Sequence, residues 1–282
     1  MSITVRRGGT SSNGWAVAST PSSPSLRQVV ASYDGYAEWS SQPVRRREIA
    51  VPRVVLIIGL GGPLTVGSRQ VRSFVAGLTP GATMTEYDDR QRGIELRLTP
   101  LGAYRLLGLP LSELTGRVVD LDAVWGRDVS RLVERLAEAA GWSERFAVLD
   151  RELSRRAADG PRPDPELEGA WRRLERTSGD VRIADLTDDT GWSRRRLAER
   201  FRAQTGLTAK ALARLLRFEH AVRLLTGPGH RSLASVALTC GYYDQAHLNR
   251  DFRELAGCTP TEYLRVRRSD ALAMAFGTAE PR

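Results

Sequence analysis

The stretch GYYDQAHLNRDF at residues 241–252 has a counterpart 50 residues earlier, GWSRRRLAERF at residues 191–201. The correspondence is wider than these two stretches, since residues 183–208 match residues 233–259. The offset is 50 residues up to the glycine–aromatic pair and 51 after it, so the second copy has one additional residue in its turn. Two helices joined by a short glycine-containing turn form a helix-turn-helix unit, and the repeat therefore predicts two such units.

The excess of basic residues lies in the repeated region. Residues 1–190 contain 26 basic and 25 acidic side chains, whereas residues 191–268 contain 15 basic and 6 acidic ones. Lys210 is the only lysine, and a genomic bias toward arginine accounts for much of the arginine content. The clustering of the basic residues, and not their number, is the electrostatic signature of a surface that binds a polyanion.

Composition indicates an ordinary globular protein, with 282 residues, 41% of them hydrophobic and 27% charged, which is enough for two cores. Cys240 and Cys258 lie beside the apolar positions of helices and predict buried thiols without a disulfide. The two cysteines and three histidines have no metal-ligand spacing. The N-terminus lacks the apolar core of a signal peptide, and the longest apolar run, residues 54–60, is too short to span a membrane. We therefore expect a cytoplasmic protein with no cofactor, no metal and no membrane contact.

The first third of the chain has the composition of strands and turns. Residues 1–25 are rich in serine, glycine and threonine, and we expect them to be disordered. Strand candidates follow at residues 54–58, 64–66, 71–76 and 93–98. The stretch from Gly59 to Pro63 is a turn signal, with residues 64–66 as the returning strand.

Helices are expected after residue 98, at residues 100–106, 128–140 and 143–156. The last two form a helical hairpin, whose apolar face either docks on the strands or makes a dimer: Leu132, Leu136, Phe146 and Leu149. Three prolines in residues 158–165 predict a stiff, exposed linker. We therefore expect a sensing or dimerisation domain at residues 26–157, an all-helical domain at residues 166–268 and a tail at residues 269–282.

Beyond the linker every expected element is a helix. The residues that mark helix starts are Pro165, Asp180, Ser193, Ser232, Asp244 and Pro260. A helix of about residues 209–225 joins the two units, while Trp171, Trp192 and Tyr242 are expected in the core. The predicted fold class is α+β, with a strand-rich, β-barrel-like N-terminal domain carrying a helical hairpin. The C-terminal domain is all-α, with two helix-turn-helix subdomains joined by the long helix.

Residues 241–263 carry a specific sequence pattern. Its members are Gly241, Tyr242, Leu248, Arg250, Phe252, Gly257, Thr259, Pro260 and Tyr263. This pattern resembles the DNA-binding domain of the AraC/XylS family of bacterial transcription regulators, and the resemblance covers residues 166–268. It implies a DNA-binding transcription regulator, more often an activator, whose N-terminal domain senses a ligand, dimerises or does both.

Candidate DNA-binding residues lie on the outward faces of the second helix of each unit. They are Arg194, Arg195, Ala198, Glu199 and Arg202 in the first copy, and Gln245, Ala246, His247, Asn249 and Arg250 in the second. Leu197, Phe201, Leu248 and Phe252 occupy the inward faces. The resemblance places base contacts on Arg195, Ala198 and Glu199, and on all five candidates of the second copy.

Side-chain chemistry agrees with these positions. Asparagine and glutamine pair with adenine, arginine pairs with guanine, glutamate accepts from cytosine, and Ala198 can contact only a thymine methyl group. Some of the candidates are expected to contact only phosphate. Pairing of Arg250 with an acidic neighbour, and His247 as a plain surface residue, are the alternatives. A joining helix of ~17 residues spans ~25 Å, compatible with two recognition helices about one DNA turn apart.

Other candidate sites are weaker. The Gly59–Leu64 stretch lacks the third glycine of a dinucleotide-binding loop, so a hairpin turn is favoured. Val55, Ile57 and Phe74 either enclose a small-molecule site or form plain core. No catalytic constellation occurs, and two buried cysteines do not suit DNA repair by alkyl transfer, so we do not expect an enzyme.

The expected partners are double-stranded promoter DNA, a small-molecule effector, RNA polymerase and a second copy of the chain. The competing interpretation is a ligand-independent DNA-binding protein whose N-terminal domain only oligomerises. Stabilisation of the N-terminal domain by a ligand would distinguish the two.

Overall fold

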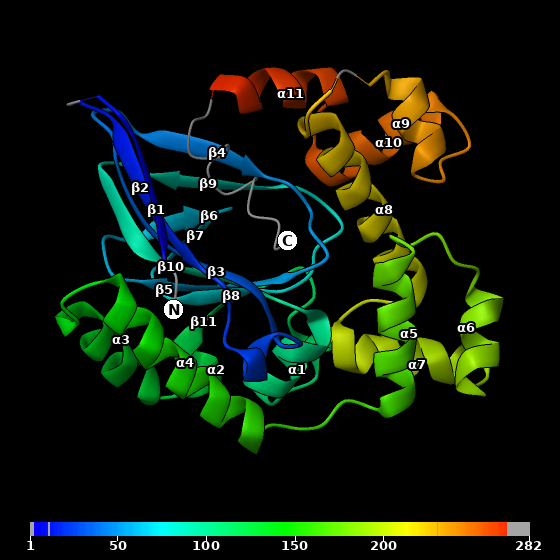
Figure 1. The fold of residues 1–282 in the computed structure, drawn as a ribbon, viewed down its shortest axis with the longest axis horizontal. Helices are drawn as coiled ribbons and strands as arrows, with labels where there is room; N and C mark the ends of the chain where they lie inside the picture. The colour runs from blue at the N-terminus through cyan, green and yellow to red at the C-terminus, as the bar shows by residue number, and fades with distance from the viewer. Residues whose placement is uncertain (1–2, 11, 230, 270–282) are drawn as a thin grey trace.

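The computed structural model describes residues 3–10, 12–229 and 231–269, with a strand-rich N-terminal half and an all-helical C-terminal half (Figure 1). The strands are β1 (Thr4–Gly9), β2 (Gly14–Thr20), β3 (Val30–Trp39), β4 (Val44–Glu48), β5 (Val54–Gly59), β6 (Leu64–Val66), β7 (Arg69–Val71), β8 (Phe74–Ala76), β9 (Thr83–Tyr87), β10 (Arg90–Leu98) and β11 (Val118–Asp120). The α+β prediction is confirmed.

The helices of the N-terminal half are η1 (Pro24–Leu26), α1 (Pro100–Leu107), η2 (Leu111–Glu113), α2 (Leu121–Trp125), α3 (Asp128–Glu138) and α4 (Trp142–Asp159). Those of the C-terminal half are α5 (Pro165–Arg176), α6 (Ile183–Thr190), α7 (Arg194–Thr205), α8 (Ala209–Thr226), α9 (Leu233–Thr239), α10 (Gln245–Ala256) and α11 (Pro260–Ser269). Apart from Ser269, the predicted tail at residues 269–282 lies outside the described residues.

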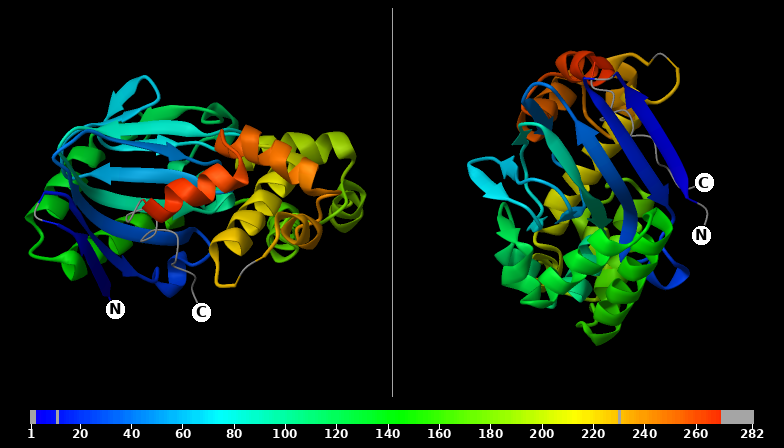
Figure 2. Two further views of the ribbon diagram at one scale, coloured as in Figure 1. Left: turned by 90° about the horizontal axis from the view of Figure 1, so that it is seen from above. Right: turned by 90° about the vertical axis from the view of Figure 1, so that its left-hand side faces the viewer.

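The described strands pair antiparallel in two sheets. One has the order β1-β2-β3-β10-β5-β8-β11 and the other β4-β9-β6-β7. The smaller sheet faces the larger one without closing a barrel, and the helices α1–α4 lie on the other side of the larger sheet (Figures 1 and 2). Successive side chains of β10 therefore alternate, because Ile94 and Leu96 meet the helices while Glu95 points between the sheets.

The helical hairpin of α3 and α4 docks on the larger sheet. Its predicted apolar face, Leu132, Leu136, Phe146 and Leu149, is buried in one cluster with Leu56, Ile58 and Leu96 of the strands. Tyr33 of β3 anchors the contact, since its hydroxyl donates to Asp150 Oδ1 at 2.7 Å. Of the two alternatives for this face, docking within the chain is the one observed.

The prediction that residues 1–25 are disordered is wrong for the described residues of this segment, 3–10 and 12–25. β1 and β2 form a hairpin within this segment, and β2 also pairs with β3 from Gly14 to Thr20. Val17 and Ala18 are buried on opposite faces of β2, in separate apolar clusters. The serine- and threonine-rich composition suits a strand once β3 supplies a pairing edge, which local composition does not reveal.

Three local predictions also need correction. The turn at Gly59–Pro63 is present, but β6 pairs with β7 and β9 in the smaller sheet instead of returning along β5. The predicted strand at residues 71–76 is divided between β7 and β8. The helix expected to be capped by Asp180 starts at Ile183 with Arg182 at its N-cap, and no side chain caps it.

The segment 158–165 is not the exposed linker that its prolines predict. Helix α4 continues to Asp159, and Pro163 is buried. The backbone N–H of Asp164 donates to Gln204 Oε1 at 3.0 Å, and the Asp164 carboxylate pairs with Arg200. Contacts with α7 thus hold this segment against the fold.

Candidate nucleic-acid interface

The second helix of each unit begins at a capped residue and ends at a glycine. Ser193 Oγ accepts from the backbone N–H of Arg196 at 3.3 Å, and Asp244 Oδ1 accepts from that of His247 at 2.7 Å. Such caps satisfy backbone donors that the first helical turn leaves unpaired. Gly206 and Gly257 end α7 and α10 in the left-handed conformation. The predicted caps Ser193 and Asp244 are confirmed.

The inward faces of both helices are fixed by apolar packing. Leu197 and Phe201 of α7, and Leu248 and Phe252 of α10, are all buried, as predicted. Trp192 and Tyr242 are buried in the two turns, and a guanidinium group lies over each ring: Arg196 over Trp192 at 5.0 Å, and Arg217 over Tyr242 at 5.8 Å. The opposite face of each helix is thereby directed outward.

Most candidate residues of α7 are exposed. Arg194, Arg195, Glu199 and Arg202 are exposed, and Ala198 is half-buried between them. Arg195 Nε donates to Glu199 Oε1 at 2.8 Å, an ion pair between residues one helical turn apart. This pair holds the Arg195 side chain along the outer face of the helix.

The candidates of α10 divide into two groups. Gln245, Ala246 and Arg250 are exposed, whereas His247 and Asn249 are half-buried. The His247 ring packs edge-on against Tyr242, with ring centroids 5.1 Å apart. Asn249 Oδ1 is buried, and none of the described atoms donates to it, so this residue is not the freely outward-facing one that the sequence predicts. Three of the five candidates of α10 are thus exposed.

An ion pair fastens α10 to the joining helix. Asp251 is buried on α10, and Arg214 of α8 donates to its Oδ1 through Nε at 2.9 Å and Nη2 at 2.7 Å. The same guanidinium contacts Glu254. Hydrogen bonds to the carboxylates of Asp251 and Glu254 raise the pKa of Arg214. The ion pair therefore links α8 and α10. For Arg250 itself, the described residues supply no ion-pair partner.

Tyr243 is not among the candidate residues predicted from the sequence. This residue is 88% exposed in the turn directly before the cap of α10. It occupies the turn that contains the additional residue of the second copy, and the change of offset from 50 to 51 was the signal that could have revealed it. The exposed side chain of Tyr243 thus lies at the N-terminal end of α10, beside the exposed Gln245.

Other predicted and possible sites are located outside these helices. Cys240 is buried, and burial raises the pKa of its thiol to about 11, whereas Cys258 is only half-buried. Ile57 and Phe74 are packed with Val66 and Val71 between the sheets.

In the part of the chain that is described, no group of three metal-ligating side chains occurs. Nor is any described helix both long and apolar enough to cross a membrane.

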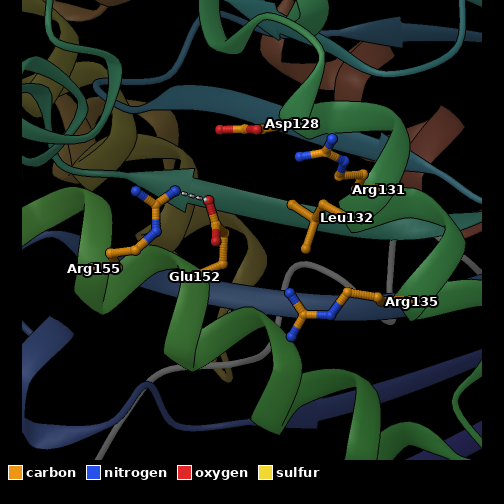
Figure 3. Close-up of a pocket in the computed structure, with 6 residues that line it drawn as sticks. All are labelled: Asp128, Arg131, Leu132, Arg135, Glu152 and Arg155. Atoms are coloured by element: carbon orange, nitrogen blue, oxygen red, sulfur yellow. Dashed lines mark hydrogen bonds and ion pairs between the residues drawn. The ribbon is translucent and has the colours of Figure 1, made fainter.

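A charged pocket of about 260 Å³ lies between α3 and α4 (Figure 3). It is lined by Asp128, Arg131, Leu132, Arg135, Glu152 and Arg155. Arg155 donates to Glu152 Oε1 at 2.7 Å across one wall. Leu132 is the one apolar side chain in this lining, so the pocket differs in character from the apolar site considered from the sequence.

The family model described as a helix-turn-helix domain matches residues 186–266. This range starts in α6, ends in α11 and contains both turns, both capped helices and the joining helix. Residues 186–266 form a helix-turn-helix domain of the AraC type.

Curated relatives match a part of this chain that is similar in length to the domain. The transcriptional activator RhaR of Yersinia pseudotuberculosis is 35% identical to this chain over 81 residues, or 29% of the chain. The match spans 28% of the length of that relative. The likeness to RhaR is therefore one of a single part of each chain.

Solved structures resemble larger parts of the molecule. ToxT from Vibrio cholerae matches 83% of this chain and 98% of its own, with 12% identity and a TM-score of 0.49. The DNA-binding domain of AdpA, solved in complex with a target DNA, matches 38% of this chain and 95% of its own, with 29% identity and a TM-score of 0.34.

Proposed function

We propose that this protein is a transcription regulator that binds promoter DNA through the outer faces of α7 and α10. The observation that supports this proposal best is the pair of capped recognition helices in the segment of residues 191–268, which carries 15 basic and 6 acidic residues. In helix-turn-helix proteins, the first residues of the second helix contact base edges in the major groove. In both units these residues are exposed.

The proposed contacts divide by helix. Arg194, Arg195, Ala198, Glu199 and Arg202 face one DNA segment, and Gln245, Ala246, His247, Asn249 and Arg250 face the other. Among them Arg195 and Gln245 have the exposure and the chemistry to select guanine and adenine. The 18 residues of α8 span ~27 Å, which suits two major-groove segments on one side of a duplex.

We further propose that an effector binds between the two sheets of the N-terminal half. Charged side chains from both sheets meet there, and Arg46 Nη1 of β4 donates to Glu38 Oε2 of β3 at 2.7 Å. Arg97 Nε donates to Glu95 Oε1 at 2.7 Å on the same face. Carboxylates and guanidinium groups suit a hydroxyl-rich ligand, and Val55, Ile57 and Phe74 provide an apolar end. If the protein is an activator, its predicted protein partners are RNA polymerase and a second copy of the chain.

The DNA proposal is tested by selecting duplexes from a random pool with the full chain. The expected result is one motif with two blocks about a DNA turn apart. Arg195→Ala blurs the first block and Gln245→Ala the second, each at a cost of ~1–3 kcal/mol for the affected base pair. Arg131→Ala and Gln42→Ala remove the same side chains at exposed positions elsewhere and leave the motif intact.

One result would contradict sequence-specific recognition by α7 and α10. Binding without an enriched motif, weakened by salt but retained by both variants, would mean that the basic surface contacts only phosphates. For the effector, the melting temperature of the full chain is measured with a panel of pentoses and hexoses and with laurate. A rise with one sugar supports the polar site, whereas a rise with laurate alone contradicts it.

A further inference from the structure

The N-terminal half contacts the last turn of α7. Thr115, just after η2, donates from its hydroxyl to the carbonyl oxygen of Gly206 at 2.7 Å. The approach is close, because a Cβ atom on Gly206 would lie 3.0 Å from Thr115 Oγ1 and 3.1 Å from Leu111 O. Arg200 of the same helix donates to both carboxylate oxygens of Asp164 at 2.6 Å. This end of α7 is thus firmly held.

The N-terminal half also contacts the last turn of α10. The backbone N–H of Ala50, in the connection between β4 and β5, donates to the carbonyl oxygen of Leu255 at 2.9 Å. Ala50 is 1% exposed and packs in one cluster with Phe252 and Leu255. Arg47 also approaches here, since a Cβ atom on Gly257 would lie 3.7 Å from its Cδ.

These two contacts fall at corresponding places in the repeat. Gly206 and Gly257 are 51 residues apart and end the two recognition helices in the same left-handed conformation. The N-terminal half therefore holds equivalent last turns of α7 and α10. Both contacts leave the first turns of the helices exposed, and those turns carry the proposed base contacts. The contacts are thus placed to position the helices without covering them.

The two units depend on these contacts to different degrees. The apolar core of the first unit, including Trp171 and Phe201, is continuous with Leu101 and Leu111 of the N-terminal half. The second unit has a separate core around Phe218 and Phe252. Helix α8 links the two cores, and the N-terminal half reaches the second one through Ile49 and Ala50.

We propose that the N-terminal half sets the distance between the two DNA segments that the chain recognises. Ala50 and Thr115 are positioning residues for α10 and α7. The contact at Ala50 matters most, because it is buried and hydrogen-bonded, whereas Gly81, Ala82 and Arg47 only lie near the end of α10. This inference rests on the proposed function. It adds that contacts of the N-terminal half determine the preferred spacing of the two DNA segments.

The test uses the full chain and duplexes in which the two selected blocks are moved apart or together by single base pairs. The wild-type chain prefers one spacing by at least about tenfold in affinity, or ~1.4 kcal/mol. Ala50→Glu places a charge in the buried contact and reduces this preference to about threefold or less, with unchanged sequences of the two blocks. Thr115→Val removes the hydroxyl donor at nearly the same volume and broadens the preference to a smaller degree.

Matched controls separate positioning from general damage. Ala158→Glu adds the same charge at an exposed position, and Thr187→Val removes a hydroxyl that bonds only within α6. Both controls keep the wild-type preference. Circular dichroism melting identifies any variant that does not fold, and Thr115→Val then carries the test.

Two outcomes would overturn the inference. An unchanged spacing preference in folded Ala50→Glu and Thr115→Val would show that α8 alone sets the distance. Tighter binding at the original spacing would show that the contacts restrain DNA binding instead of positioning the helices. A wild-type chain that selects no two-block motif contradicts the proposed function itself, which is a separate result.

Discussion

Asp34 of β3 is a carboxyl group enclosed between the two sheets, 3% exposed, with the hydroxyl of Ser19 donating to it. Burial raises the pKa of Asp34 above its ordinary value, in spite of the lowering influence of Ser19, Arg97 and Arg6. A folded-state pKa above the unfolded one means that the folded state binds the proton more tightly. The charged form of Asp34 therefore destabilises the fold at neutral pH.

We expect Asp34→Asn to raise the free energy of unfolding by about 1 kcal/mol at pH 7, because asparagine still accepts from Ser19 without a buried charge. The gain disappears near pH 3, where wild-type Asp34 is protonated in both states. Urea denaturation at the two pH values measures both quantities. Asp188→Asn, at an exposed position of α6, serves as the control, and an equal gain at both pH values would contradict the assignment.

At the scale of elements, the turn glycines differ in what surrounds them. Gly191 ends α6 with φ +65° and has open space where a Cβ atom would lie. Gly206 ends α7 with φ +86° and lies against Thr115 and Leu111. Both conformations disfavour a side chain, but only Gly206 is also crowded by the N-terminal half.

Gly191→Ala should therefore lower the free energy of unfolding by about 1 kcal/mol, the cost of a left-handed alanine. Gly206→Ala should cost at least about 1 kcal/mol more, because the new methyl group overpacks the interface. Urea denaturation of the two single variants provides the comparison. Equal costs would mean that the contact between η2 and α7 is looser than the structure shows.

At the scale of the whole molecule, the described residues form two main apolar cores, and one of them is much larger than the other. The larger core runs from Ala18 in β2 to Leu216 in α8, whereas the second helix-turn-helix unit surrounds a smaller cluster of its own. Regions with separate cores open separately, at free energies that follow the apolar contacts each would lose.

Native-state hydrogen exchange should reveal this division. We expect amides of α9 and α10 to exchange at a lower opening free energy than those of α7, which should exchange together with β10. Mass spectrometry of exchanged peptides gives the order. The Ala50→Glu variant should accelerate exchange in α10 with little change in α7, and joint exchange of all three helices would contradict the two-core description.

Much of the C-terminal half was predictable from local signals. Ser193, Ser232, Asp244 and Pro260 were identified as helix starts because capping is chemistry between residues three positions apart. Most outward residues of α7 and α10 followed from helical periodicity. The half-buried position of Asn249 did not, because it depends on what packs beside the helix.

The sequence alone determined the α+β class, the duplicated units, their caps and the concentration of positive charge, since all of these are properties of neighbours along the chain. Only the tertiary structure decided that residues 4–9 and 14–20 are strands, that β6 pairs in the other sheet instead of with β5, and that Asp164 is bound to α7. The contacts of Thr115 with Gly206 and of Ala50 with Leu255 belong to the same group. They join residues 91 and 205 positions apart, and no local pattern encodes a partner at that distance, because long-range pairing depends on the packed shape of both surfaces.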